Sequence, residues 1–159
     1  MSVFNQKQLK KKYMIDLSKF AENISAFMDE KHINAPALAL QIGTDRSNIT
    51  RYKQGKRLPS FEVFISLLQF FNISADVLLG RRDYIEQTAF MPILPFGERL
   101  RAVMLETKTT QYRIEKEQNI SAASMHAWLN GTTLPSVENL DKLADYMDVS
   151  IDYLLGRIR

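Results

Sequence analysis

The stretch from Thr44 to Gly55 reads TDRSNITRYKQG, and a stretch of the same pattern, ISAASMHAWLNG, runs from Ile120 to Gly131, 76 residues later. Both have a polar residue at the second position, an apolar residue at the sixth, an aromatic residue at the ninth and a closing glycine. The spacing predicts the same short helix twice. The first copy carries two arginines and a lysine, whereas the second carries no formal charge.

The repeat extends far beyond these twelve residues. Residues 20–81 align with residues 96–157 without a gap and share 17 identical residues, which predicts two domains of one fold. We expect the N-terminal domain at 17–80 and the C-terminal domain at 96–157. A basic N-terminal arm at 1–16 precedes them. The linker at 81–95 holds two prolines and several apolar residues, so we expect it to pack on protein.

Each repeat is predicted to form five short helices, because apolar residues recur at helical spacing and no strand-like alternation occurs. The second helix begins at Asn34 in one repeat and at Thr110 in the other, and it ends at Gly43 or Asn119. Side chains at the start of the later helices can accept hydrogen bonds from free backbone N–H groups. These expected caps are Asp45, Ser60 and Ser74 in the first repeat, and Ser121, Ser136 and Ser150 in the second.

The composition excludes several classes of function. The chain has no cysteine and two histidines, so we expect no metal site and no cofactor. The sequence contains no paired catalytic carboxylates and no glycine-rich phosphate loop, which argues against an enzyme. No segment resembles a signal peptide or a membrane helix, and we expect a cytoplasmic protein. The sequence gives no sign of a small-molecule pocket.

Charge is unevenly distributed along the chain. Residues 1–83 hold 13 lysines and arginines against 8 acidic residues, whereas residues 84–159 hold 8 against 10. Affinity for a polyanion is therefore expected in the first half. The fourth helix also differs between the repeats, because Ile65 of the first aligns with Asp141 of the second. We expect the additional apolar residues Phe61, Ile65 and Phe70 to be covered by protein.

The frame resembles the phage Cro/repressor (XRE) family of helix-turn-helix domains. The residues that carry this resemblance are Leu38, Gly43, Ile49, Tyr52, Gly55, Pro59 and the terminal LLG in the first repeat, and Ile114, Met125, Trp128, Gly131, Pro135 and a second LLG in the other. The resemblance covers about residues 17–157. It implies an all-α protein made of two tandem five-helix lambda-repressor-like helix-turn-helix domains. It further implies a transcriptional regulator, most simply a repressor, of bacterial or phage origin that binds double-stranded DNA.

In that family the second helix of the motif enters the major groove, and residues near its N-terminus contact base edges. The resemblance assigns base reading to Arg46, Ser47, Asn48, Thr50 and Arg51. It assigns phosphate contacts to Asn34, Lys53, Lys56 and Arg57, and also to Lys10, Lys11 and Lys12, which resemble the basic arm that some phage repressors wrap around the duplex. The alternative for these three lysines is the solvated start of a helix. Arginine suits base reading because its planar guanidinium matches guanine O6 and N7.

The second repeat differs at the reading positions, where it has Ala122, Ala123 and Ala127. Alanine contacts a thymine methyl group but cannot hydrogen-bond a base edge. The remaining polar candidates for DNA contact there are Gln111, Ser124 and His126. Two arrangements follow. Either the second domain dimerises the chain so that two first domains read a palindrome, or the chain is a pseudo-dimer on an asymmetric site.

A protein-binding module, such as an antirepressor or an antitoxin-like factor, is the rival interpretation. The neutral second repeat suits that role. The basic cluster of the first repeat argues against it, since so many cations on one reading helix serve no packing purpose. Single exposed arginines and lysines are common on any protein surface, so the weight rests on their joint placement.

Overall fold

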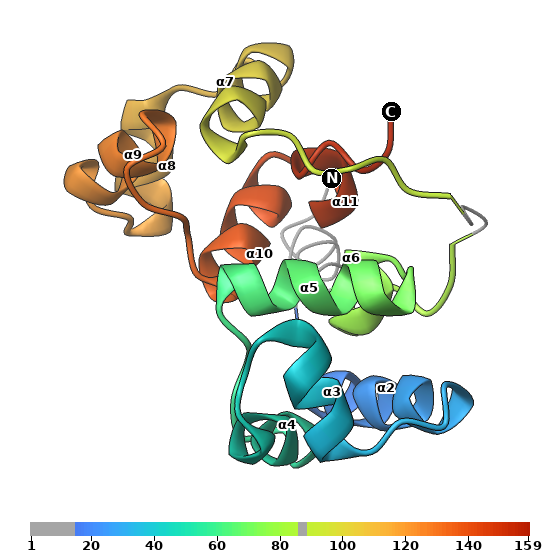
Figure 1. The fold of residues 1–159 in the computed structure, drawn as a ribbon. Coiled ribbons are helices and arrows are strands. Elements are labelled where there is room, and N and C mark those ends of the chain that lie inside the picture. Colours follow the sequence, from blue (N-terminus) through green and yellow to red (C-terminus); the bar gives the residue numbers. More distant parts are fainter. Residues whose placement is uncertain (1–14, 86–88) are drawn as a thin grey trace. The chain divides into compact units, whose positions relative to one another are not determined.

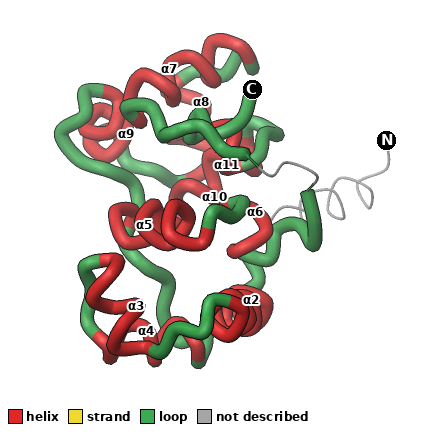
Figure 2. Tube along the Cα trace, turned by 45° about the vertical axis from the view of Figure 1, so that its right-hand side comes forward, coloured by secondary structure: helices red, strands yellow, loops and turns green. Residues whose placement is uncertain are grey.

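The computed structural model describes residues 15–85 and 89–159, and the chain divides into two compact units between Ala89 and Phe90. We call these the first unit and the second unit. Figure 2 shows helices and loops only, and the described residues form ten helices and no strand, which confirms the all-α prediction. None of the described helices is both long and apolar enough to cross a membrane.

The first unit is built from five helices (Figure 1). They are α2 (Leu17–Glu30), α3 (Ala35–Ile42), α4 (Arg46–Lys53), α5 (Phe61–Phe71) and α6 (Ala75–Leu78). Both α2 and α3 pack against α4, while α5 contacts α3 and α6 contacts α2. The core contains side chains from all five helices, including the fully buried Phe20, Leu38, Ile49 and Leu67. Phe61 and Ile65 are buried as well, and Phe70 is half-buried.

The second unit repeats this order of helices. They are α7 (Phe96–Glu106), α8 (Gln111–Gln118), α9 (Ala122–Leu129), α10 (Val137–Tyr146) and α11 (Ile151–Leu154). Helix α9 packs against α7 and α8, and α10 contacts α8 and α11. Its core is formed by residues that align with core residues of the first unit, such as Leu100, Ile114 and Met125.

The backbone geometry shows that the two units share one fold. Every described residue of the first unit with a positive φ has a counterpart with a positive φ exactly one repeat, 76 residues, further along. The pairs are His32 and Lys108, Gly43 and Asn119, Gly55 and Gly131, Asn72 and Asp148, and Gly80 and Gly156. Left-handed residues mark where helices end and the chain turns. Each turn is therefore made at the same place in both units.

Most of the predicted caps are confirmed. Asn34 accepts a hydrogen bond from the Ala37 N–H, and the two serines Ser60 and Ser74 accept from the third residue after each of them. The four caps expected in the second unit, at Thr110, Ser121, Ser136 and Ser150, are formed in the same way. The prediction for Asp45 is wrong in one respect. Asp45 precedes α4 in an extended conformation, but its side chain makes no capping hydrogen bond.

A buried ion pair closes the last turn of each unit. Arg81 donates to Asp76 at 2.7 Å in the first unit, and Arg157 donates to Asp152 at 2.6 Å in the second. All four side chains are at most 4% exposed. Removing one partner of such a pair leaves a charge buried in a medium of low dielectric constant. The pairs therefore tie the chain after α6 and α11 to the helices that they follow.

The ends of the predicted linker pack on their own units. Arg81 is bound to the first unit by its ion pair, and the Met91 and Leu94 N–H groups donate to the carbonyls of Arg157 and Leu155 in the second. Residues 86–88, within the linker, lie outside the described residues, as do residues 1–14 of the predicted arm.

The first helix is one turn shorter in the second unit. Helix α2 begins three residues before the buried Phe20, whereas α7 begins at the aligned residue, Phe96. Pro92 and Pro95 precede Phe96, and a residue that is followed by proline disfavours the helical conformation. The segment before α7 is consequently non-helical.

Candidate nucleic-acid interface

Helices α3 and α4 of the first unit form a helix-turn-helix. Helix α3 ends at Gly43, whose φ of 71° and ψ of 42° place it in the left-handed region, and α4 begins three residues later, at Arg46. Tyr52 of α4 is buried and its ring meets that of Phe20 edge-to-face, with 6.1 Å between the ring centroids. Gly55 then lets the chain pass α2 closely, since a Cβ atom there would lie 3.3 Å from the Leu17 carbonyl oxygen. These contacts fix α4 on the unit.

Helix α4 has one buried face and one exposed face. Ile49 and Tyr52 point into the core, as the sequence predicts for Ile49. The predicted base-reading residues Arg46, Ser47, Thr50 and Arg51 are all exposed. The Thr50 hydroxyl donates to the Arg46 carbonyl at 3.2 Å, so its proton is used within the helix. The two arginines and the Ser47 hydroxyl therefore remain as donor groups on this surface.

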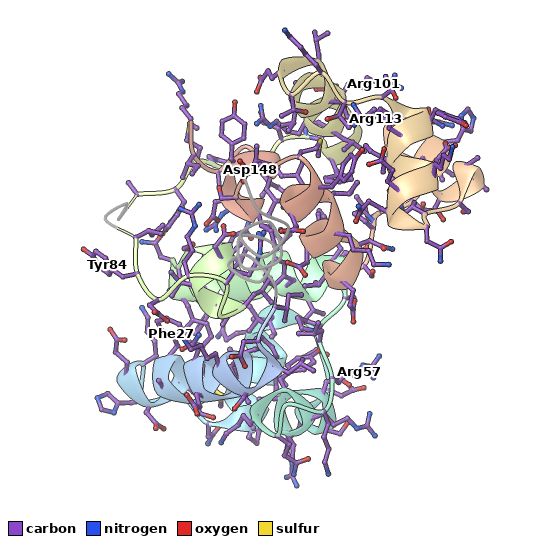
Figure 3. All side chains as sticks on the ribbon, turned by 180° about the vertical axis from the view of Figure 1, so that it is seen from behind. Phe27, Arg57, Tyr84, Arg101, Arg113 and Asp148 are labelled. Atoms are coloured by element: carbon purple, nitrogen blue, oxygen red, sulfur yellow. The ribbon has the colours of Figure 1, made fainter. Side chains whose placement is uncertain are left out.

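Asn48 is held differently from the other reading candidates. Its side-chain oxygen accepts from Arg57 Nη1 at 3.1 Å, and its side-chain nitrogen donates to the Thr44 hydroxyl at 2.9 Å. Asn48 is half-buried, while Arg57 is exposed just beyond the end of α4 (Figure 3). Both ends of the amide are thus engaged within the first unit. Asn48 links the turn before α4 to the arginine that follows it.

Tyr52 belongs to the same group of side chains. Burial raises the pKa of its hydroxyl, whereas a hydrogen bond to Thr44 and the positive charge of Arg57 act in the opposite direction. The tyrosine is therefore both a core residue and the inner end of a polar chain. That chain, which we call the α4 network, consists of Tyr52, Thr44, Asn48 and Arg57.

The predicted phosphate-contacting residues are placed around the same helix. Lys53, Lys56 and Arg57 are exposed at its C-terminal end and in the loop that follows. Asn34 is exposed at the start of α3, where its side-chain oxygen caps the helix. The predicted contacts of Lys10, Lys11 and Lys12 lie outside the described residues. From Thr44 to Arg57 the chain has five cationic residues and one acidic residue, Asp45.

The corresponding helix of the second unit presents a neutral surface. Ala122, Ala123 and His126 are exposed on α9, and the Ser124 hydroxyl is hydrogen-bonded to that of Ser121 at 2.9 Å. The remaining candidate for DNA contact, Gln111, donates to the Glu115 carboxylate at 2.6 Å. A carboxylate at this position disfavours a nearby phosphate because the two charges repel each other.

The second unit has also lost the α4 network as a whole. Ile120, which is buried, stands at the position of Thr44, and Trp128 at that of Tyr52. Ser124 and Thr133 replace Asn48 and Arg57. The sequence analysis did not identify this network. Its signal was the joint replacement of four aligned positions, but only the structure shows that those side chains touch.

The described residues contain no group of histidine, cysteine, aspartate and glutamate side chains that could hold a metal ion. They do contain a cavity of about 580 Å³ in the second unit, beside Arg99. The sequence analysis missed it.

Comparison with known proteins agrees with this geometry. Residues 5–83 match a family described as a helix-turn-helix domain, and residues 100–154 match a second helix-turn-helix family. A stretch of 60 residues is 40% identical to the cryptic phage CTXphi transcriptional repressor RstR of Vibrio cholerae serotype O1. That stretch is 38% of this chain and 54% of the relative, so the match spans about half of the relative's length. No solved structure matches the chain. The chain therefore carries two helix-turn-helix domains in tandem, of the Cro/phage-repressor (XRE) type.

Proposed function

We propose that this protein is a sequence-specific DNA-binding transcriptional regulator that reads the major groove with α4. The two helix-turn-helix domains and the similarity to a phage transcriptional repressor support a DNA-binding regulator in general terms. Helix-turn-helix regulator families are generally not enzymes. Repression is the mode of action that the relative's name suggests.

The contrast between α4 and α9, the corresponding helix of the second unit, carries the proposal. The segment from Thr44 to Arg57 has a net charge of +4, whereas the aligned segment from Ile120 to Thr133 has no formally charged residue. The first segment's five cationic side chains are all exposed. Both units keep the buried residues that position the helix, so folding alone does not require this charge. A cationic surface on a helix that fits the major groove is the expected footprint of a DNA reader.

Within this proposal the exposed residues have separate tasks. Arg46 and Arg51 hydrogen-bond base edges, most favourably the O6 and N7 atoms of guanine. Lys53, Lys56 and Arg57 neutralise phosphates, which adds affinity through counterion release without reading sequence. Asn34 and the first turn of α3 add a phosphate contact, and so does the lysine-rich arm at residues 10–12.

The second unit serves dimerisation, so that two first units meet two half-sites one helical turn apart, about 34–36 Å. The loss of charge on α9 favours this arrangement over a pseudo-dimer in which both units enter the groove. In a pseudo-dimer the remaining contacts would come from Gln111, Ser124 and His126. Two of these, Gln111 and Ser124, are hydrogen-bonded within the unit.

The test is the binding of Arg46→Ala and Arg51→Ala to a site selected for the parent protein. Each change should cost about 1–3 kcal/mol and relax the preference at one base position. Sedimentation of the parent with the same duplex should give two chains per site. Unchanged affinity in both variants would show that α4 is not the helix that reads the DNA sequence. A parent that binds no duplex would favour a protein partner, for which the neutral surface of the second unit is suited.

A further inference from the structure

The second unit has a cavity of about 580 Å³, open to solvent, beside the start of α7. It is lined by the segment 91–94, by Arg99 of α7, and by Tyr153, Gly156, Ile158 and Arg159. Its volume falls within the range of small-molecule sites, about 300–1,000 Å³. All of the lining residues belong to the second unit, so the cavity is complete within that unit.

The shorter first helix explains why the cavity exists in this unit. In the first unit the extra turn of α2 brings Lys19 against Gly80, where an added Cβ atom would lie 2.6 Å from the Lys19 Cβ. Lys19 also forms an ion pair with Asp83, so its side chain covers the surface beside Gly80. In the second unit the prolines before α7 remove this turn. Gly156, the counterpart of Gly80, is instead approached by the side chains of Leu94 and Arg99.

The residues that line the cavity include both aliphatic and cationic side chains. Ile93, Leu94 and Ile158 contribute aliphatic side chains, while Arg99 and Arg159 contribute positive charge. None of the residues that line it is acidic. Charge complementarity therefore selects an anion, and the aliphatic wall selects a hydrocarbon body on the same molecule.

Arg99 carries the anion-binding argument. One terminal nitrogen donates to the Tyr153 carbonyl at 2.6 Å, and the guanidinium carbon lies 5.0 Å from the centroid of the Tyr153 ring. These contacts hold the guanidinium in place. Its Nε atom is shielded from solvent and makes no hydrogen bond within the residues that the structure describes. The guanidinium therefore has a single hydrogen-bond acceptor within the described residues, the Tyr153 carbonyl, and its positive charge faces no carboxylate side chain among the residues that line the cavity.

The first unit shows that capping this carbonyl does not require an arginine. Asn23 stands at the position of Arg99, and its side-chain nitrogen donates to the Val77 carbonyl, the counterpart of the Tyr153 carbonyl, at 2.8 Å. A short amide therefore performs the structural task in the same fold. The guanidinium in the second unit provides additional donors and a charge that the capping does not use.

From these observations we propose that the second unit binds a small carboxylate with an apolar body in this cavity. Arg99 donates hydrogen bonds to the carboxylate, Arg159 adds positive charge, and Ile93, Leu94 and Ile158 contact the hydrocarbon part. This proposal does not depend on DNA binding by the first unit, and its test contains no DNA.

The test is calorimetric titration of the full chain with octanoate, using 1-octanol as the neutral probe of the same chain length. Octanoate should bind saturably at one site per chain, and octanol about tenfold or more weakly, because a hydrogen bond to a charged group is lost. The decisive variant is Arg99→Asn, which installs the residue of the first unit and so keeps a donor for the Tyr153 carbonyl. It should weaken octanoate binding by about tenfold or more.

The matched control is Arg113→Asn. Arg113 is an exposed arginine of the second unit that does not line the cavity (Figure 3), so this variant removes the same charge elsewhere. It should leave octanoate affinity within about twofold, since exposed charges contribute little at a distance in salt. The proposal is overturned if octanoate shows no saturable binding, if octanol binds equally well, or if Arg99→Asn and Arg113→Asn behave alike. Thermal unfolding of both variants without ligand verifies that each one is folded.

Discussion

The salt dependence of DNA binding is a quantitative consequence of the charges on the first unit. Lys53, Lys56 and Arg57 are the exposed residues that we assign to phosphates. Each neutralised phosphate contributes about −0.9 to the slope of log K against log salt concentration. These three contacts alone contribute about −2.7 to the slope per first unit and about −5.4 for two chains on a palindrome, to which the arm at residues 10–12 adds the same amount in parent and variant.

The change Lys56→Ala removes one of these contacts from each chain. The slope for the dimer should then be less steep by about 1.8, with the remaining two contacts per chain contributing about −3.6. Between 50 and 200 mM salt these contacts alone should lower the affinity of the parent about 2,000-fold and that of the variant about 150-fold, so the variant should lose about 12-fold less affinity than the parent. Lys56 is exposed and its backbone N–H remains bonded to the Arg51 carbonyl, so the fold should be unaffected.

The assay is fluorescence anisotropy with a labelled specific duplex and a labelled unrelated duplex, titrated at a series of KCl concentrations. Lys142→Ala, a change of an exposed lysine on α10, is the matched control and should keep the parent's slope. The change in slope should be equal on the two duplexes, because phosphate contacts carry no sequence information. An unchanged slope for Lys56→Ala, or a loss confined to the specific duplex, would refute the assignment.

Three further changes test other parts of the account. Asn48→Ala should weaken specific binding in the parent but have almost no effect in an Arg57→Ala background, because Asn48 acts through Arg57; a double-mutant cycle of duplex affinity measures this, and additive losses would contradict it. Arg81→Met should lower the free energy of unfolding by about 3–5 kcal/mol in urea denaturation, while the joint change with Asp76→Leu should recover most of the loss. A double variant as unstable as the single one would show that the ion pair is not the cause. Ala122→Gln should leave the selected DNA site unchanged, and a new base preference in site selection would place α9 in the groove.

The sequence predicts local features of this fold well. The caps at Asn34, Ser60 and Ser74 were predictable because a capping hydrogen bond joins residues three positions apart. The left-handed ends at Gly43 and Asn119 were predictable because glycine, and after it asparagine, adopts a positive φ at helix ends most readily. Asp45 shows the limit of such reasoning, since a suitable residue at a helix start does not ensure that the bond forms.

Features that join distant residues were not predictable. The α4 network requires that Arg57, beyond the end of α4, donates a hydrogen bond to Asn48 within the helix. No periodic pattern in the sequence indicates that contact. The cavity beside Arg99 arises because two prolines shorten a helix and because the C-terminal residues do not fill the space. The prolines were visible in the sequence, but the resulting space depends on how the side chains pack.

Selection of bound sites from a random duplex library tests the central claim most directly. The parent protein and an Arg46→Ala/Arg51→Ala double variant are compared at the same moderate salt concentration. We predict that the parent enriches a palindrome with half-sites one helical turn apart, and that the double variant loses this motif while remaining folded. The same palindrome in both selections, or no enrichment by the parent, would contradict the assignment of α4 as a DNA-reading helix.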